Sequence, residues 1–482
     1  MPTEPKDLSL QIAWLPDLLY TAGKFQSGRA LVCDASGNVV NVASVDELRE
    51  EKRVRLSGRA MLPGMINAHS HAFQRVLRGR TEYRTSPQSL SGGRMPAGSD
   101  GSPTLIEEKD SFWTWREMMY SAATRLTPED IYDASRMAFM EMALGGITAV
   151  GEFHYLHHGP DGMPYDDPNL LAKEVIRAAN DVGLRIALLR VAYGRSGFQA
   201  EENPRQARFI ETDPQVYLRN LERLRGDVSS QSAAWIGIAP HSVRAVPIPY
   251  LRAVIEFAGA HNLKVHMHVA EQPAEVSACV EEYGRSPLAL LDTEGLLNEN
   301  FTAVHAIHVT AKAIASFAKS GAMVCACPTT ERNLGDGVVP ADEYFNCGVR
   351  ICLGTDSHAQ IDLFEDAREL EYHLRLQKLE RALLDVTELF DCATLHGARS
   401  IGAPSGALEA GKPADFFTVD LGDPSVAGAS RDNLLSQIVF AASRAAIREV
   451  VVGGRPVVSE GQHLLQADVV EKFHALQKRL WS

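Results

Sequence analysis

The sequence predicts an α/β protein built on a (β/α)8 TIM-like barrel, with a small β-rich domain formed by the N- and C-terminal segments. Three observations predict it: the length of the chain, a series of eight apolar runs in its middle, and a different pattern at both ends. A chain of 482 residues exceeds one ordinary compact core. A barrel of roughly 250 residues or more with an attached module accounts for that length.

The middle of the chain alternates short apolar or β-branched runs with amphipathic stretches, which is typical of a parallel sheet with crossover helices. The helical stretches include 169–182, 248–261 and 310–320, the last beginning at Thr310, a favourable N-cap. Eight strands favour a closed barrel, although the periodicity alone also allows an open, doubly wound sheet. The predicted strands are 62–71, 146–154, 184–193, 234–243, 263–271, 301–309, 322–328 and 350–357.

Both ends of the chain read as short strands and turns. Examples are the runs 30–34 and 37–42 near the start, and 415–420 and 449–452 near the end. We therefore expect the two ends to meet in one small β domain. The predicted division is a first part at 1–59, a metal-dependent barrel at 60–405, and a second part with a terminal helix at 406–482.

The segment 83–110 interrupts the barrel pattern directly after its first strand and is rich in Ser, Gly and Pro. It is either a disordered insertion or a lid over the active site, because loops that follow barrel strands line the catalytic face.

Composition excludes several classes of partner. The formal net charge of −13 argues against nucleic acid and anionic membranes, whose phosphates need clustered Lys and Arg. It does not exclude an acidic small molecule. The sequence shows neither a signal peptide nor an apolar run of the roughly 20 residues that a membrane span needs, so we expect a cytoplasmic protein. The seven scattered cysteines indicate reduced, buried thiols, and Cys325 and Cys327 are expected to pack in the core.

Polar residues gather at the ends of the predicted strands, where barrel enzymes place their catalytic groups. His69 and His71 close the first strand, and their spacing of two puts both on one face. His268 ends the fifth strand, with His266 one layer deeper, and Asp356 ends the eighth. Three imidazoles and one carboxylate make a shell that leaves room for water, which is the catalytic form of a zinc site. Such a metal lowers the pKa of bound water to about 7.

Further candidates for proton transfer follow the fifth strand and lie on the sixth. Glu271 comes three residues after His268, and His305 and His308 lie on opposite faces of their strand. We expect His305 to point inward and His308 to lie outside or at the rim. Glu271 and His305 are then the proton-transfer groups, and Asp356 can take a proton from water while touching the metal.

The run Pro-Gly-Met-Ile-Asn-Ala-His-Ser-His at 63–71 and the glycine-rich return at 406–415 resemble motifs of the amidohydrolase superfamily. In its dinuclear members a carbamylated lysine on the fourth strand bridges two metals. The run 234–243 contains no lysine, so the resemblance implies one divalent metal per chain. Zinc is expected, and iron and manganese are the alternatives. The implied ligands are His69, His71, His268 and Asp356.

Within the superfamily, the sequence resembles the deiminases that convert N-formimidoyl-L-glutamate and water to N-formyl-L-glutamate and ammonia in histidine degradation. The matching runs are 69–75, 112–117, 152–155, 240–244, 268–272, 328–335 and 356–358. The resemblance implies a small dicarboxylate substrate and a homodimer. The segment 83–110 departs from it by its length. The implied substrate contacts are Gln74, Arg116, Tyr155, His241 and Arg244.

The residue types agree with that substrate, because a glutamate derivative brings two carboxylates and arginine can hold a carboxylate bidentately. Taken singly, Arg116 or Arg244 could equally form a surface salt bridge. Two other functions stay open. One is a deaminase or chlorohydrolase of the same superfamily acting on a heterocycle, whose pocket would favour aromatic stacking. The other is a non-catalytic scaffold. Such a protein would be expected to have lost a metal-ligating or proton-transfer residue, and none of these is missing from the sequence.

Overall fold

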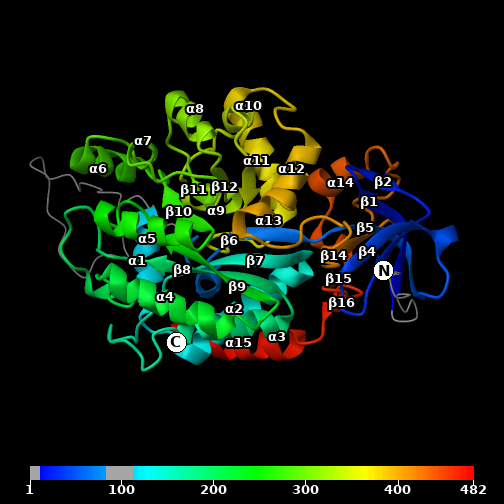
Figure 1. Ribbon diagram of the computed structural model, residues 1–482, viewed down its shortest axis with the longest axis horizontal. Helices are drawn as coiled ribbons and strands as arrows, with labels where there is room; N and C mark the ends of the chain where they lie inside the picture. The colour runs from blue at the N-terminus through cyan, green and yellow to red at the C-terminus, as the bar shows by residue number, and fades with distance from the viewer. Residues whose placement is uncertain (1–10, 83–111) are drawn as a thin grey trace, which may run out of the picture.

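A barrel of eight parallel strands occupies the middle of the chain in the computed structural model, which describes residues 11–82 and 112–482 (Figure 1). The strands follow one another around the barrel in sequence order. Their bounds are β6 Met65–Ser70, β7 Ile147–His154, β8 Arg185–Ala192, β9 Ala234–Pro240, β10 Val265–Val269, β11 Phe301–His305, β12 Met323–Ala326 and β13 Ile351–Leu353. The proposed insertion 83–110 lies outside the described residues.

The barrel closes where its first and last strands meet. Ser70 and Asp356 form a parallel bridge, and the amide of His71 donates to the carbonyl of Asp356 at 3.1 Å. The carbonyl of His69 accepts from the amides of Thr355 at 3.0 Å and Asp356 at 3.1 Å. The predicted barrel is therefore confirmed, and the open sheet that periodicity also allowed is wrong.

All eight predicted strands are present, because strands buried on both faces read as continuous apolar runs. Every residue of β7, for example, is buried. The first predicted strand, 62–71, is shorter in the structure. Leu62 and Pro63 end β5 (Lys52–Pro63) of the other sheet, and β6 begins only at Met65. At the junction, a Cβ added to Gly64 would lie 2.3 Å from the hydroxyl oxygen of Thr148, so glycine lets the two segments pass closely.

Helices connect the strands and cover the barrel. As predicted, the side chain of Thr310 caps its helix by accepting from the amide of Ala313. No helix in the described ranges is long and apolar enough to span a membrane. The helices are α1 Phe112–Ala123, α2 Pro128–Leu144, α3 Leu170–Val182, α4 Pro214–Val228, α5 Ile248–Ala260, α6 Pro273–Tyr283, α7 Pro287–Thr293, α8 Ala311–Lys319, α9 Pro328–Leu334, α10 Ala341–Asn346, α11 Leu363–Lys378, α12 Val386–Cys392, α13 Leu395–Ile401, α14 Leu434–Ala441 and α15 Gln466–Trp481.

Helix α13 lies against the N-terminal ends of the strands. The indole nitrogen of Trp235 in β9 donates to the carbonyl of Ile401 at 2.7 Å, and His266 in β10 bonds the carbonyl of Ser400 at 3.1 Å. A Cβ added to Gly397 would lie 2.8 Å from the carbonyl oxygen of Ile66, so the helix touches the strand backbone directly. This end of the barrel is filled, which leaves the opposite, C-terminal end for a cavity.

The two ends of the chain share a second sheet, as predicted. Strand β5 pairs antiparallel with β14, and Figure 1 shows the blue N-terminal strands beside the orange-red C-terminal ones. The strand order is β17-β16-β15-β14-β5-β1-β3-β4, with β2 paired to β1. The remaining bounds are β1 Ile12–Thr21, β2 Lys24–Gln26, β3 Arg29–Cys33, β4 Val39–Ser44, β14 Phe416–Asp420, β15 Ile447–Val452, β16 Arg455–Ser459 and β17 Gln462–His463.

The last helix returns from this sheet to the barrel. In α15, Asp468 pairs with Arg136 of α2 at 2.7 Å, and the side-chain Nε2 of Gln477 donates to the carbonyl of Val76 at 3.0 Å. The division of the chain at residues 59/60 and 405/406 stays a prediction.

Candidate active site

Four side chains from the C-terminal ends of the barrel strands converge. The Nε2 atom of His69 lies 3.2 Å from Nε2 of His268 and 3.3 Å from Oδ1 of Asp356, and Nε2 of His71 lies 3.1 Å from the same carboxylate oxygen. All four side chains are buried, and one ligand atom from each lies within 4.8 Å of the others. The structure therefore brings together the four predicted metal ligands.

The hydrogen bonds behind this cluster show that its donor atoms fit a cation. His71 Nδ1 lies 2.9 Å from the carbonyl oxygen of Phe153, and His268 Nδ1 lies 3.1 Å from that of His241. A carbonyl only accepts, so each Nδ1 carries a hydrogen, and Nε2 of a neutral ring then has a lone pair available for a cation.

Burial also favours the neutral form of His69 and His268. It lowers the pKa of His69 to about 3 and the pKa of His268 well below its usual range. The Nε2 atoms of His69 and His268 lie 3.2 Å apart, and those of His69 and His71 lie 3.3 Å and 3.1 Å from Oδ1 of Asp356, so the four ligand atoms are close enough together to share one cation. Imidazole nitrogens with one carboxylate are a donor set suited to zinc-like ions.

Next to this cluster, His305 of β11 lies among carboxylates. Its Nε2 is 3.7 Å from Oε1 of Glu271 and 3.8 Å from Oδ2 of Asp356. Burial opposes its protonation, but Glu271, together with Glu331 and Asp356, raises the pKa of His305 to about 10. Burial raises the pKa of Glu271 as well. Two groups able to hold and move a proton thus stand beside the candidate metal ligands. His308, by contrast, turns away and bonds the carbonyl of Asp336 at 2.8 Å.

Glu331 holds the far side of the His305 ring, and sequence reasoning missed it. Its Oε1 accepts from Nδ1 of His305 at 3.2 Å and from the amide of Cys327 at 2.8 Å. With these two residues Cys327 forms a second group of possible ligand atoms. However, burial raises the pKa of the Cys327 thiol well above its usual value, so the thiol stays protonated and is a poor ligand. This supports the prediction that Cys327 packs in the core.

A polar network behind the ligands also escaped the sequence analysis. The hydroxyl of Ser70 donates to Oε2 of Glu152 at 2.5 Å and lies 3.0 Å from Nε2 of His358. Glu152 also accepts from the amide of Ala72 at 2.7 Å. These bonds tie β7 and the segment after β13 to β6, and so fix the strand end that carries His69 and His71.

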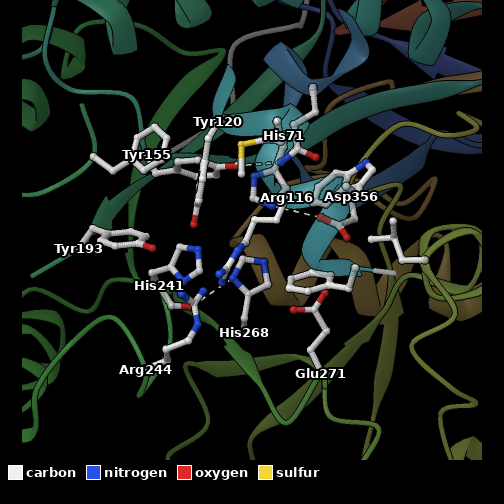
Figure 2. Close-up of a pocket in the computed structure, with 16 residues that line it drawn as sticks. His71, Arg116, Tyr120, Tyr155, Tyr193, His241, Arg244, His268, Glu271 and Asp356 are labelled. Carbon is white, nitrogen blue, oxygen red and sulfur yellow. Dashed lines mark hydrogen bonds and ion pairs between the residues drawn. The ribbon is translucent and has the colours of Figure 1, made fainter. Parts of the chain in front are cut away.

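A cavity opens above the cluster (Figure 2). All five residues predicted to contact the substrate line this cavity, together with aromatic side chains that the sequence analysis did not single out. The lining residues are His71, Gln74, Phe112, Trp115, Arg116, Met119, Tyr120, Tyr155, Tyr193, Phe209, His241, Arg244, His268, Glu271, Leu334 and Asp356.

The polar side chains of the cavity have capacity left for a ligand. Gln74 donates to the hydroxyl of Tyr155 at 2.8 Å, and its own Oε1 is buried with no partner among the described residues. Nη1 of Arg244 is likewise buried without a hydrogen-bond partner among the residues that the structure describes. Arg116 extends from α1, its guanidinium 5.6 Å from the ring centre of Tyr120. Figure 2 shows Arg116 and Arg244 reaching toward the same part of the cavity. Two guanidinium groups facing one cavity suit an anionic ligand.

Comparisons with known proteins agree with this geometry. The model of the amidohydrolase family matches residues 60–457. The chain is 39% identical to formimidoylglutamate deiminase of Pseudomonas aeruginosa over 414 residues, covering 84% of this chain and 86% of that protein. It is 25% identical to 5-methylthioadenosine/S-adenosylhomocysteine deaminase of Haloarcula marismortui, covering 92% and 94%. Among solved structures, an amidohydrolase from Brucella melitensis superposes with a TM-score of 0.85 at 31% identity, covering 98% and 100%.

Proposed function

This chain belongs to the amidohydrolase family, and from that premise we propose that it is a metal-dependent deiminase that hydrolyses N-formimidoyl-L-glutamate to N-formyl-L-glutamate and ammonia. One observation carries the proposal: candidate metal ligands and two arginines border the same cavity. The relative at 39% identity, a formimidoylglutamate deiminase, supports the choice of substrate.

In this proposal a single divalent ion, zinc, is held by His69, His71, His268 and Asp356. The ion supplies Lewis acidity, which makes hydroxide available at neutral pH and polarises the C=N group. Arg116 and Arg244 bind the two carboxylates of the substrate as charge-assisted pairs. Gln74, Tyr155 and His241 add hydrogen bonds from the cavity wall, and together these five residues orient the formimidoyl group toward Asp356 and Glu271.

The proton movements follow from the positions of three side chains. Asp356 accepts a proton as water adds to the C=N carbon, which turns the planar amidine into a tetrahedral adduct. Glu271 and His305, 3.7 Å apart, steady that adduct and pass a proton to the departing nitrogen. Loss of ammonia then restores a planar carbon as the formyl group. One water is consumed and one ammonia is released, so the atoms balance.

The same cavity allows a direct test against a heterocyclic substrate. The metal-loaded protein is expected to release ammonia from N-formimidoyl-L-glutamate and not from guanine. Turnover of guanine without turnover of the amidine would instead favour the heterocycle deaminases of the family. No turnover of either compound by a protein with full metal content would support a scaffold without catalysis.

We expect one divalent metal per chain. The four converging ligand atoms offer one coordination site, and β9 (Ala234–Pro240) brings no lysine that could bridge a second ion. Elemental analysis of the purified protein should give a ratio of one. Chelation should abolish ammonia release, and adding zinc should restore it. A ratio of two would contradict the single-metal site.

Replacing Glu271 by glutamine is expected to lower kcat by about 10²- to 10⁴-fold, the usual contribution of a general acid or base. Glutamine keeps the shape of the side chain but cannot pass a proton to the leaving nitrogen. Metal content should stay at one per chain, since Glu271 lies outside the ligand set. Glu174→Gln, on the outer helix α3, is the matched control and should keep the original rate. Loss of the metal from Glu271→Gln would show that Glu271 is a ligand and that its assigned role is wrong.

The family resemblance extends this proposal to a homodimer acting in histidine degradation. Light scattering on the purified protein tests the assembly, and a monomer mass would remove that part of the proposal.

A further inference from the structure

One buried glutamine holds two tyrosine hydroxyls behind the cavity wall that carries the arginines. Gln206 ends a short 3-10 turn (Pro204–Gln206) after β8, and only 1% of it is exposed. Its Nε2 donates to the hydroxyl oxygen of Tyr120 at 2.6 Å and to that of Tyr193 at 2.9 Å. The amide of Gln206 also bonds the carbonyl of Asn203 at 2.9 Å, which fixes the turn. Both tyrosines line the cavity, whereas Gln206 stands behind them.

This arrangement determines where the hydroxyl hydrogens point. A tyrosine hydroxyl has one hydrogen, and an oxygen that accepts from Gln206 must direct that hydrogen elsewhere. Arg244 interacts electrostatically with Tyr193, and a guanidinium group has hydrogen-bond donors only. Burial raises the pKa of Tyr120, so its hydroxyl keeps its proton. Figure 2 shows the two hydroxyls on the cavity side of their rings, near His241. Both O–H groups therefore remain as donors for a ligand in the cavity.

The part of the cavity wall formed by the two arginines and the two tyrosines therefore presents hydrogen-bond donors almost exclusively. The guanidinium groups of Arg116 and Arg244 have no acceptor, and the two hydroxyl oxygens already accept from Gln206. A carboxylate has acceptors only and matches such a wall. The edge of a neutral heterocycle, which presents N–H groups as well, would leave some of its donors without partners.

We propose that Gln206 is a positioning residue that commits the hydroxyls of Tyr120 and Tyr193 to donating toward a substrate carboxylate, and so sets the selectivity for a dicarboxylate. The inference rests on the proposed function for its substrate class. Gln206 acts through the tyrosines and touches no substrate itself.

The test measures binding as well as turnover. Titration calorimetry with glutarate and with N-formyl-L-glutamate uses the metal-loaded full chain. Gln206→Met frees both hydroxyls to rotate and should raise Kd by about 10- to 100-fold, the size expected for one or two hydrogen bonds to a charged group. Gln206→Glu should weaken binding further, because a carboxylate accepts both hydroxyl hydrogens and repels the ligand. With N-formimidoyl-L-glutamate, KM should rise by the same factor while kcat stays close to its original value.

Tyr120→Phe and Tyr193→Phe remove only the hydroxyls and test the same contact if a Gln206 variant does not fold. In the double Phe background Gln206→Met should cost no further affinity, because its effect passes through those hydroxyls. Gln231→Met, an exposed glutamine bonded to Asn180, is the control and should bind normally.

Unchanged Kd in the Gln206 variants or in both Phe variants overturns the inference, as does an original protein that binds neither dicarboxylate. A protein that binds dicarboxylates through Gln206 but releases no ammonia from the amidine would instead refute the proposed function alone.

Discussion

Asp356→Asn is expected to lower ammonia release by about 10⁴-fold, the upper end of what one acid or base group contributes. The carboxylate has two tasks in the proposed reaction, because it lies in the ligand cluster and takes the proton from water. An amide keeps the shape of the side chain but is a far weaker base. Oδ1 of Asp356 lies 3.1 Å from Nε2 of His71 and 3.3 Å from Nε2 of His69, so the substituted side chain has little room to move. Single-turnover ammonia release with N-formimidoyl-L-glutamate measures the loss.

Asp366→Asn provides a matched control for this substitution. Asp366 is also fully buried, but its Oδ1 accepts from the amide of Thr329 at 3.0 Å and from its hydroxyl at 2.8 Å, away from the cavity lining. Burial raises the pKa of Asp366 well above its usual range, so the side chain is protonated and asparagine imitates it closely. This variant should keep its rate. An Asp356→Asn variant with a near-normal rate would remove the proposed mechanism.

Removal of one cavity arginine should be almost as damaging. Arg244→Ala or Arg116→Ala leaves a substrate carboxylate desolvated without its partner, which costs about 2–5 kcal/mol for a buried charge pair. That cost corresponds to a fall in kcat/KM of about 30- to 5,000-fold. Comparing N-formimidoyl-L-glutamate with an analogue that lacks one carboxylate assigns the arginines. Removing the arginine that binds the missing carboxylate should leave kcat/KM for the analogue unchanged.

An outer arginine supplies the comparison for these variants. Arg252 is exposed and pairs only with Glu294 among the described residues, so Arg252→Ala should retain full kcat/KM. If neither cavity arginine affects kcat/KM for the amidine, they do not select the substrate, and the heterocycle alternative becomes the better interpretation.

The sequence predicted the parts of the molecule that depend on local periodicity. Strands such as β7 are buried on both faces and therefore stand out as apolar runs. The candidate metal ligands could be picked out because His69 and His71 repeat with the period of a strand at its C-terminal end. The same alternation distinguished His305 from His308, one facing Asp356 and the other bonding the carbonyl of Asp336.

Residues that act through others left no such signal. Gln206 lies in a turn, and its two partners come from α1 and from the end of β8, so no spacing connects them. Glu331 reads as an ordinary residue in the first turn of a helix. Tyr120, one helical turn after Arg116, and Tyr193, at the end of the predicted strand 184–193, had positions that could have been inferred from the sequence.

The pairing of β6 with the segment after β13 has a consequence for biosynthesis. His69 and His71 leave the ribosome early, but the segment that holds their strand end, with the Asp356 carboxylate, follows almost 290 residues later. Ser70 forms a parallel bridge with Asp356, and its hydroxyl contacts the ring of His358, 288 positions further along the chain. The second sheet also needs the late part of the chain, because β5 near the N-terminus pairs with β14 near the C-terminus. A nascent chain therefore cannot present the complete ligand set until most of it has been translated. In the proposed function, metal binding would therefore be a late event, because a chain released prematurely would contain the three histidines without the Asp356 carboxylate.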